Sequence, residues 1–206
     1  MANERLSTGL EQLGLKAEPQ RIGRIEQLYR ALIRWNRVVN LTAVTDESDF
    51  ITRHVLDSLA IHPYLHGDRI LDVGTGAGFP GLPLALFFPD RRFVLLDAVA
   101  KKIRFVRQMV LELGLTNVTA VHARVEAYAE RAGFTTIVTR AFAEAGKAFT
   151  LSRHLLAPEG RFLAMKGHYP REELEDLTPG SYRVIPVSVP HLEAERHLIE
   201  ITPTDT

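Results

Sequence analysis

The pattern of apolar and polar positions changes character at about residue 66. Before that point, apolar residues recur at intervals of three and four, which is the period of an amphipathic helix. Three helices are predicted there, over residues 3–15, from Pro19 onward, and over roughly residues 47–65. Because they precede every strand-like run, we predict a helical N-terminal extension over residues 1–66, packed on a main domain over residues 67–206.

After that point, short β-prone runs alternate with helical patterns. We expect strands at residues 69–73, 92–97, 117–121, 135–140 and 160–165, and helices at 80–88, 100–113, 124–130, 143–156 and 170–177. This alternation predicts a parallel sheet with helices on both faces. Two last runs, at 182–187 and 196–201, have no full helix between them and predict an antiparallel hairpin. The fold class is therefore α/β, with a Rossmann-like, mostly parallel seven-stranded sheet and a terminal hairpin.

The segment that narrows the function most is a turn of small residues. Residues 70–81 read Ile-Leu-Asp-Val-Gly-Thr-Gly-Ala-Gly-Phe-Pro-Gly, so a predicted strand passes through glycines into a helix. Pro80 suits the first position of that helix. Such a turn lets a ligand lie against backbone N–H groups, and a nucleotide-like cofactor is expected there. The spacing from Gly76 to Gly81 also fits the dinucleotide motif G-x-G-x-x-G.

Asp72 favours one cofactor over the other. A carboxylate at the end of the strand would repel a pyrophosphate and attract the α-amino group of S-adenosylmethionine, which carries no phosphate. Asp97 ends the next strand, where either cofactor would place its ribose hydroxyls. We predict S-adenosyl-L-methionine, bound by Asp72, Gly74, Gly76 and Asp97; NAD, or a turn without a ligand, is the alternative. Five parallel strands and a hairpin also form the sheet of class I S-adenosylmethionine-dependent methyltransferases.

Composition excludes several classes of function. The 206 residues include no cysteine, so disulfides, thiolate zinc sites and cysteine nucleophiles are excluded. The eight histidines show no metal-ligand spacing, and no metal is predicted. No run of eighteen apolar residues occurs, and the N-terminus lacks the apolar core of a signal peptide. We therefore expect a cytoplasmic protein that does not span a membrane.

The charges balance overall, at 25 basic and 25 acidic residues, but they are segregated along the chain. Residues 1–41 carry seven basic and four acidic side chains, and residues 91–107 carry six basic and one acidic. Residues 171–206 carry three basic and eight acidic. This segregation permits a local phosphate-binding face, although ordinary solvated helix faces would give the same pattern.

The residues at the strand ends restrict the methyl acceptor. Methylation of a pyrimidine C5 needs a cysteine nucleophile, and methylation of an exocyclic amine commonly uses an Asn/Asp-Pro-Pro-aromatic turn. Here that turn reads Thr139-Arg140-Ala141-Phe142. A ring nitrogen such as guanine N7 needs no base, because it carries no proton. Arg140 and Lys166 are then the candidate catalytic residues that hold the base or a phosphate; a salt bridge is the alternative for Arg140.

Two further features of the N-terminal extension have a structural and a functional interpretation. Arg53, His54 and Asp57 fall within one helical turn, and Arg53 and Asp57 could simply pair. Bracing is the favoured interpretation, and a place beside the cofactor is the alternative. Trp35, the only tryptophan, is predicted to pack in the core and not to stack on a base.

Over about residues 20–170 these motifs resemble one family. They follow the order seen in the bacterial small-subunit (16S) ribosomal RNA methyltransferase G family, also known as glucose-inhibited division protein B. The matching segments are residues 40–43 (Asn-Leu-Thr-Ala), 53–59, 72–81, 95–97, 101–106, 139–143 and 164–167. The resemblance implies methylation of guanine N7 in 16S ribosomal RNA, in a loop near the decoding site. It also implies cofactor contacts at Gly74, Phe79, Val125, Glu126 and Arg140.

The expected partner is 16S ribosomal RNA or the small ribosomal subunit, contacted through phosphates by segments 21–37 and 91–107. We expect a monomer. Three other functions stay open at this point: a methyltransferase of the same fold acting on another RNA, a protein or a small molecule, an NAD-dependent oxidoreductase, and a non-enzymatic RNA-binding factor.

Overall fold

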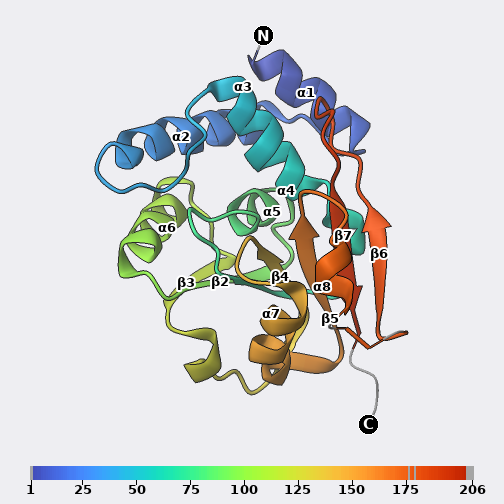
Figure 1. Cartoon of the computed structure of the whole chain (residues 1–206). Coiled ribbons are helices and arrows are strands. Elements are labelled where there is room, and N and C mark those ends of the chain that lie inside the picture. Colours follow the sequence, from blue (N-terminus) through green and yellow to red (C-terminus); the bar gives the residue numbers. More distant parts are fainter. Residues whose placement is uncertain (1, 176, 179, 203–206) are drawn as a thin grey trace.

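A central sheet of seven strands organises the described chain, which comprises residues 2–175, 177–178 and 180–202 of a computed structural model (Figure 1). The strand order is β3-β2-β1-β4-β5-β7-β6. The strands are β1 Arg69–Val73, β2 Arg92–Asp97, β3 Val118–His122, β4 Phe134–Arg140, β5 Leu156–Lys166, β6 Tyr182–Pro186 and β7 His197–Ile201. Strands β1 to β5 are parallel, and β7 is antiparallel to β5 and β6. The predicted fold class and terminal hairpin are confirmed.

The N-terminal extension is helical, as predicted. Its helices are α1 Ala2–Gln12, α2 Pro19–Asn36, α3 Glu47–Phe50 and α4 Asp57–Leu59, with a π-helical segment at Ile51–Leu56 and a 3₁₀ turn at His62–Tyr64. Pro19 occupies the first turn of α2, where its missing N–H costs no hydrogen bond. Asp46 caps α3, because its Oδ1 accepts the N–H of Asp49 at 3.0 Å. The third predicted helix therefore exists, with a π-helical interruption in its middle.

The helices after β1 correct two of the predictions. They are α5 Gly81–Phe87, α6 Ala100–Glu112, α7 Ala145–Ser152 and α8 Arg171–Glu175, with 3₁₀ turns at Val125–Ala127 and Arg153–Leu155. Pro80 precedes α5 as its N-cap residue and does not begin the helix. The predicted helix over 124–130 is wrong, because the chain becomes extended at Tyr128 (φ −83°, ψ 137°) after a single turn.

The fifth strand begins earlier than predicted. Leu156 already pairs with Phe134, ahead of an irregularity in the β4–β5 register, so the preceding helix cannot reach residue 156. Asp176, which belongs to the predicted helix 170–177, lies outside the described residues. No described helix is both long and apolar enough to cross a bilayer.

Each face of the sheet has its own apolar cluster. Side chains of the N-terminal helices, such as Leu28 and Leu56, pack in one cluster with Ile70 of β1 and with α5 and α6. On the other face, Leu71 of β1 packs in a cluster with α7. Figure 1 shows α2, α3 and α5 above the sheet and α7 below it. The N-terminal extension thus packs on the sheet, and its boundary with the main domain at residues 66 and 67 stays a prediction.

Candidate functional site

Asp72 holds the glycine turn after β1 in place through hydrogen bonds. This side chain is fully buried, and its Oδ2 accepts the hydroxyl of Thr75 at 2.6 Å and the N–H of Gly81 at 2.9 Å. A Cβ at Gly81 would lie 2.6 Å from Leu95 Cγ and 2.8 Å from Asp72 Oδ2, so only glycine lets α5 begin this close to the sheet. Asp72 therefore determines where the turn and the helix start, a role that the sequence did not predict.

The two carboxylate oxygens of Asp72 differ in their hydrogen bonding. Its Oδ1 is buried and has no hydrogen-bond partner among the described residues. Burial raises the pKa of Asp72 to about 6, while the hydrogen bonds from Thr75 and Gly81 and the charge of Arg140 act in the opposite direction. An unpaired buried carboxylate oxygen is costly, so a positive charge brought to this edge of the sheet would stabilise it.

Asp97 joins the ends of β1 and β2. Its Oδ2 accepts the N–H of Gly76 at 2.9 Å, and its Oδ1 accepts the N–H of Val99 at 2.8 Å. Gly76 has a φ of +60°, and a Cβ built there would meet nothing closer than the carbonyl of Gly74, at 3.9 Å. Two of the residues predicted to bind the cofactor are thus in direct contact, below open space over the turn.

Arg140 ends β4 and contacts the N-terminal extension. Its Nη1 donates to the carbonyl of Arg53 at 3.1 Å and lies 3.4 Å from Asp57 Oδ2, and its Nη2 lies 3.2 Å from His54 Nδ1. The guanidinium also stands over the ring of Phe79, 5.4 Å from its centroid. These contacts use three of the five guanidinium N–H groups. Arg140 thus forms a salt bridge, but a largely buried one at the edge that carries the glycine turn.

The contact with Arg140 determines the protonation state of His54. A guanidinium can only donate, so His54 Nδ1 must accept, and the ring hydrogen is on Nε2. That hydrogen points to Thr42 Oγ1, 2.8 Å away. Burial, together with the smaller effect of the Arg140 charge, lowers the pKa of His54 to about 3. The neutral ring stacks on Phe79, with centroids 4.6 Å apart and planes 15° apart.

Asp57 binds two arginines, and neither of them is Arg53. Asp57 is buried, and its Oδ1 accepts from Arg196 Nε at 2.7 Å, while Oδ2 faces Arg140. The predicted pairing of Arg53 with Asp57 is wrong: Arg53 pairs with Asp49 at 3.4 Å. The π-helical segment is the reason, because the N–H of Asp57 reaches back five residues to Thr52, and positions four apart no longer share one face.

Lys166 ends β5 and is held by α8. Its Nζ lies 2.6 Å from Glu173 Oε2 and 3.3 Å from the carbonyl of Ala143. The same oxygen of Glu173 accepts the N–H of Ala145 at 2.7 Å, at the start of α7. Lys166 therefore fixes the loop that follows Arg140, and its direct role towards a substrate stays a prediction.

The other residues predicted to contact the cofactor surround the same edge. Val125 is buried and Glu126 is exposed in the 3₁₀ turn after β3. Phe142, which the sequence did not single out, lies on the glycine turn: a Cβ at Gly74 would come within 2.6 Å of its ring. Phe142 remains 36% exposed, so it forms an aromatic cover over the Gly74 end of the turn.

Sequence reasoning missed Arg196 and Glu173, which hold Asp57 and Lys166 in place. Arg196 lies 139 residues from Asp57 along the chain, and Glu173 lies in a segment without a recognisable motif. No local pattern therefore reveals either pairing. Thr42 is different, because it lies within a motif already singled out. Only its hydrogen bond with His54 required the structure.

Comparison with known sequences shows that the chain is similar to ribosomal RNA methyltransferases. A family model described as rRNA small subunit methyltransferase G (GidB) matches residues 21–199. The Ribosomal RNA small subunit methyltransferase G of Methylococcus capsulatus is 48% identical over 200 residues, covering 97% of this chain and 98% of that protein. The protein of the same name from Aeromonas salmonicida is 46% identical over 200 residues, covering 96% of each.

Solved structures show the same fold at lower identity. A SAM dependent methyltransferase from Aquifex aeolicus superposes with a TM-score of 0.55 at 19% identity, covering 75% of this chain and 92% of that one. A Precorrin-6y C5,15-methyltransferase from Geobacter metallireducens gives a TM-score of 0.53 at 18% identity, covering 80% and 91%. These likenesses show that the chain shares its fold with both of these proteins.

Proposed function

Because this chain belongs to the rRNA small subunit methyltransferase G family, we propose that it transfers a methyl group from S-adenosylmethionine to N7 of a guanine in 16S ribosomal RNA. Family membership gives the enzyme class and the class of RNA. The position on the base, and a target loop near the decoding site, follow from the resemblance of the motifs. The observation that carries the proposal is the contact between Gly76 and Asp97, with open space on the side of Gly76 where a side chain would lie.

The residues at the carboxyl edge suit S-adenosylmethionine better than a dinucleotide. Asp97 reaches the turn from the end of β2, where ribose hydroxyls bind in sheets of this type. The unpaired Oδ1 of Asp72 adds negative charge below the turn, which favours the α-amino group of the methyl donor and opposes a diphosphate. Gly74, Phe79, Val125, Glu126 and Arg140 complete the proposed set. When bound, the cofactor supplies an electrophilic methyl group.

This chain's own residues then have to place the acceptor and exclude water. Guanine N7 presents a lone pair and no proton, so methylation requires no general base. Arg140 has N–H groups that its three protein contacts do not use, and these can hold the O6 edge of the base or a phosphate. Phe142 covers the turn and, in that position, shields the methyl group from solvent.

We further propose that the protein acts in the cytoplasm as a monomer on 16S ribosomal RNA or the assembled small subunit. The exposed basic residues of α2 and α6 support binding to a polyanion, because several of them lack an acidic partner in the described chain.

Transfer of radiolabelled methyl groups to small ribosomal subunits from cells that lack the gene tests the function. The label is expected on one guanine, at N7, and mapping of the modified base identifies it. Asp97→Ala should reduce transfer at least about tenfold, because it removes the acid proposed to bind ribose. Asp90→Asn, at an exposed position before β2, is the matched control. Tight binding of NADH with no binding of S-adenosylhomocysteine would overturn the proposal.

A further inference from the structure

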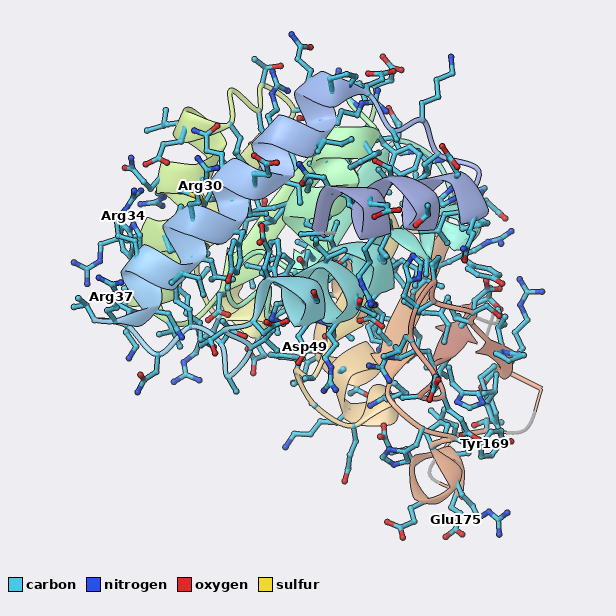
Figure 2. The ribbon with its side chains drawn as sticks, turned by 90° about the horizontal axis from the view of Figure 1, so that it is seen from above. Arg30, Arg34, Arg37, Asp49, Tyr169 and Glu175 are labelled. Atoms are coloured by element: carbon cyan, nitrogen blue, oxygen red, sulfur yellow. The ribbon has the colours of Figure 1, made fainter. Side chains whose placement is uncertain are left out.

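A basic groove lies between the end of α2 and the start of α6. It has a volume of about 490 Å³ and is lined by Arg34, Trp35, Val38, Val39, Lys101 and Arg104. The lining thus contains three cations and no acid. Figure 2 shows Arg34 and Arg37 projecting from the same edge of the molecule, so Arg37 adds a further cation near this lining. We call this feature the α2–α6 groove.

The floor of the α2–α6 groove is apolar. Trp35 packs edge-on against the buried ring of Phe105, with centroids 5.6 Å apart and planes 67° apart. Beside it, Val38 is 87% exposed, more than any other large hydrophobic side chain of the described residues. An indole held from below next to an uncovered valine offers a flat apolar surface for another flat group. The predicted role of Trp35 in packing is therefore incomplete, because it also lines this groove.

The cations of the α2–α6 groove are poorly neutralised. Arg34 reaches one acid, Glu112, at 3.8 Å, while Lys101, Arg104 and Arg37 have no acidic partner in the described part of the chain. Neighbouring basic residues differ, since Arg30 lies 3.6 Å from Glu26 and Lys102 lies 3.8 Å from Asp97. A surface that keeps most of its positive charges unpaired around an apolar floor favours an anionic ligand with flat apolar groups.

The α2–α6 groove also adjoins the proposed methyl-transfer site. Helix α6 begins three residues after Asp97, and Lys102 in its first turn faces that carboxylate. Lys101, the adjacent residue, lines the groove instead. A strand bound along the groove would therefore run beside the edge of the sheet that holds the cofactor residues.

We propose that the α2–α6 groove binds an unpaired nucleotide segment of the substrate RNA, with a base on Trp35 and Val38 and phosphates on Arg34, Lys101 and Arg104. The inference rests on the proposed function and names the RNA structure that this surface selects. Unpaired bases expose their flat faces, whereas an RNA helix keeps them stacked inside. An unpaired RNA segment supplies both an anionic backbone for the three cations and flat bases for the apolar floor.

Trp35 provides a direct test, because it is the only tryptophan in the chain. Its fluorescence is followed while the full-length protein is titrated with a twelve-nucleotide unstructured oligoribonucleotide, or with a perfectly paired RNA hairpin of equal length. We expect saturable quenching by the unstructured RNA and at least about fivefold weaker binding of the hairpin. The double variant Lys101→Gln with Arg104→Gln should raise the dissociation constant about tenfold and reduce the salt slope by about 1.4.

Two further variants make the test specific. Val38→Ser leaves every charge in place and should weaken RNA binding about threefold through the lost apolar contact. Lys16→Gln with Arg131→Gln removes two exposed cations elsewhere, one between α1 and α2 and one before β4, and should leave binding and quenching unchanged. S-adenosylhomocysteine should bind all variants equally, because none of the substituted residues belongs to the proposed cofactor set.

The outcomes separate this inference from the proposed function. Methyl transfer to ribosomal subunits without any quenching of Trp35 would overturn the groove assignment and leave the function intact. Quenching by polyglutamate but not by RNA would also overturn it, in favour of an acidic protein partner. RNA-dependent quenching in a protein that neither binds S-adenosylhomocysteine nor transfers methyl groups would support the groove and refute the function.

Discussion

At the scale of single residues, His54 shows how one side chain is fixed by its neighbours. It accepts from Arg140 on one nitrogen, donates to Thr42 on the other, and stacks on Phe79. The contact with Arg140 requires the neutral ring, because a protonated ring would direct an N–H at a guanidinium. The structure therefore tolerates His54 only in its uncharged form.

This protonation state predicts a loss of stability in acid. The folded-state pKa of about 3 is below the unfolded value near 6.5, so on acidification the unfolded chain binds a proton that the folded chain does not. Between pH 7 and pH 5 wild type should lose about 2 kcal/mol of unfolding free energy relative to His54→Gln. Urea titrations of both proteins at pH 7, 6 and 5 measure this. A difference that does not change with pH would contradict it.

The raised pKa of Asp72 predicts that the affinity for the cofactor also depends on pH. With a pKa raised by burial to about 6, its carboxyl is charged above that pH and neutral below it. The affinity for S-adenosylhomocysteine, which has the same α-amino group, should therefore be about tenfold lower at pH 5 than at pH 7. Asp72→Asn should bind it weakly at both pH values. Calorimetric titration measures these affinities.

A matched ligand provides the control for Asp72. 5′-Methylthioadenosine has the nucleoside but no amino acid, so its affinity should stay constant over the same pH range. If both ligands weaken together on acidification, a general change of the site is responsible and the role of Asp72 as a charge partner is wrong.

At the scale of elements, Asp57 joins three parts of the chain that are distant in sequence. It follows the π-helical segment of the N-terminal extension, faces Arg140 at the end of β4, and accepts from Arg196 just before β7. Because Asp57 is buried, loss of either arginine leaves a negative charge with incomplete compensation. Arg196, just before β7 of the C-terminal hairpin, thus helps to hold Asp57, the carboxylate that pairs with Arg140.

Arg196→Gln should therefore destabilise the protein by about 1 to 3 kcal/mol and lower methyl transfer, although position 196 lies outside the segments on which the resemblance to the family rests. Denaturant unfolding and kcat/KM on ribosomal subunits measure the two effects. Arg30→Gln is the matched control: it removes an exposed pair with Glu26 and should change stability by less than about 0.5 kcal/mol. Equal effects of the two variants would exclude the bracing role of Arg196.

At the scale of the whole molecule, basic residues that are grouped along the chain are also grouped in space. Figure 2 shows Arg30, Arg34 and Arg37 along α2 at one side, with Tyr169 and Glu175 at the other. The net charge of zero therefore coexists with a basic side formed by these arginines of α2. A polyanion should approach with its backbone against α2 and α6.

This grouping of basic residues predicts steeply salt-dependent binding to ribosomal RNA. A surface that neutralises six or more phosphates should lose about a thousandfold in affinity between 50 mM and 200 mM salt. Arg34→Glu with Arg104→Glu should weaken binding at least about tenfold at fixed salt, whereas Arg171→Glu, in α8 near Glu175, should change it less than about threefold. Filter binding over a salt series measures both. A flat salt response would contradict a role for these charges.

The sequence by itself determined the order of elements, the sheet and the position of the glycine turn after β1. These features depend on local periodicity and on glycines, which act over a few residues and leave a readable pattern. The strand positions of β1 and β2 and the start of α2 at Pro19 were predicted correctly for this reason. The weaker periods around residues 124–130 and 156 did not determine the boundaries, because sheet register and loop packing decide them.

Only the tertiary structure decided which polar groups meet. Asp57 had a plausible partner four residues away, yet it binds Arg140 and Arg196, because a π-helical turn and burial direct it into the fold. Likewise, Lys166 meets Glu173, and Trp35 lines a groove with Lys101. Backbone patterns are local and can be read along the chain, whereas the partners of buried charges depend on the packing of distant segments.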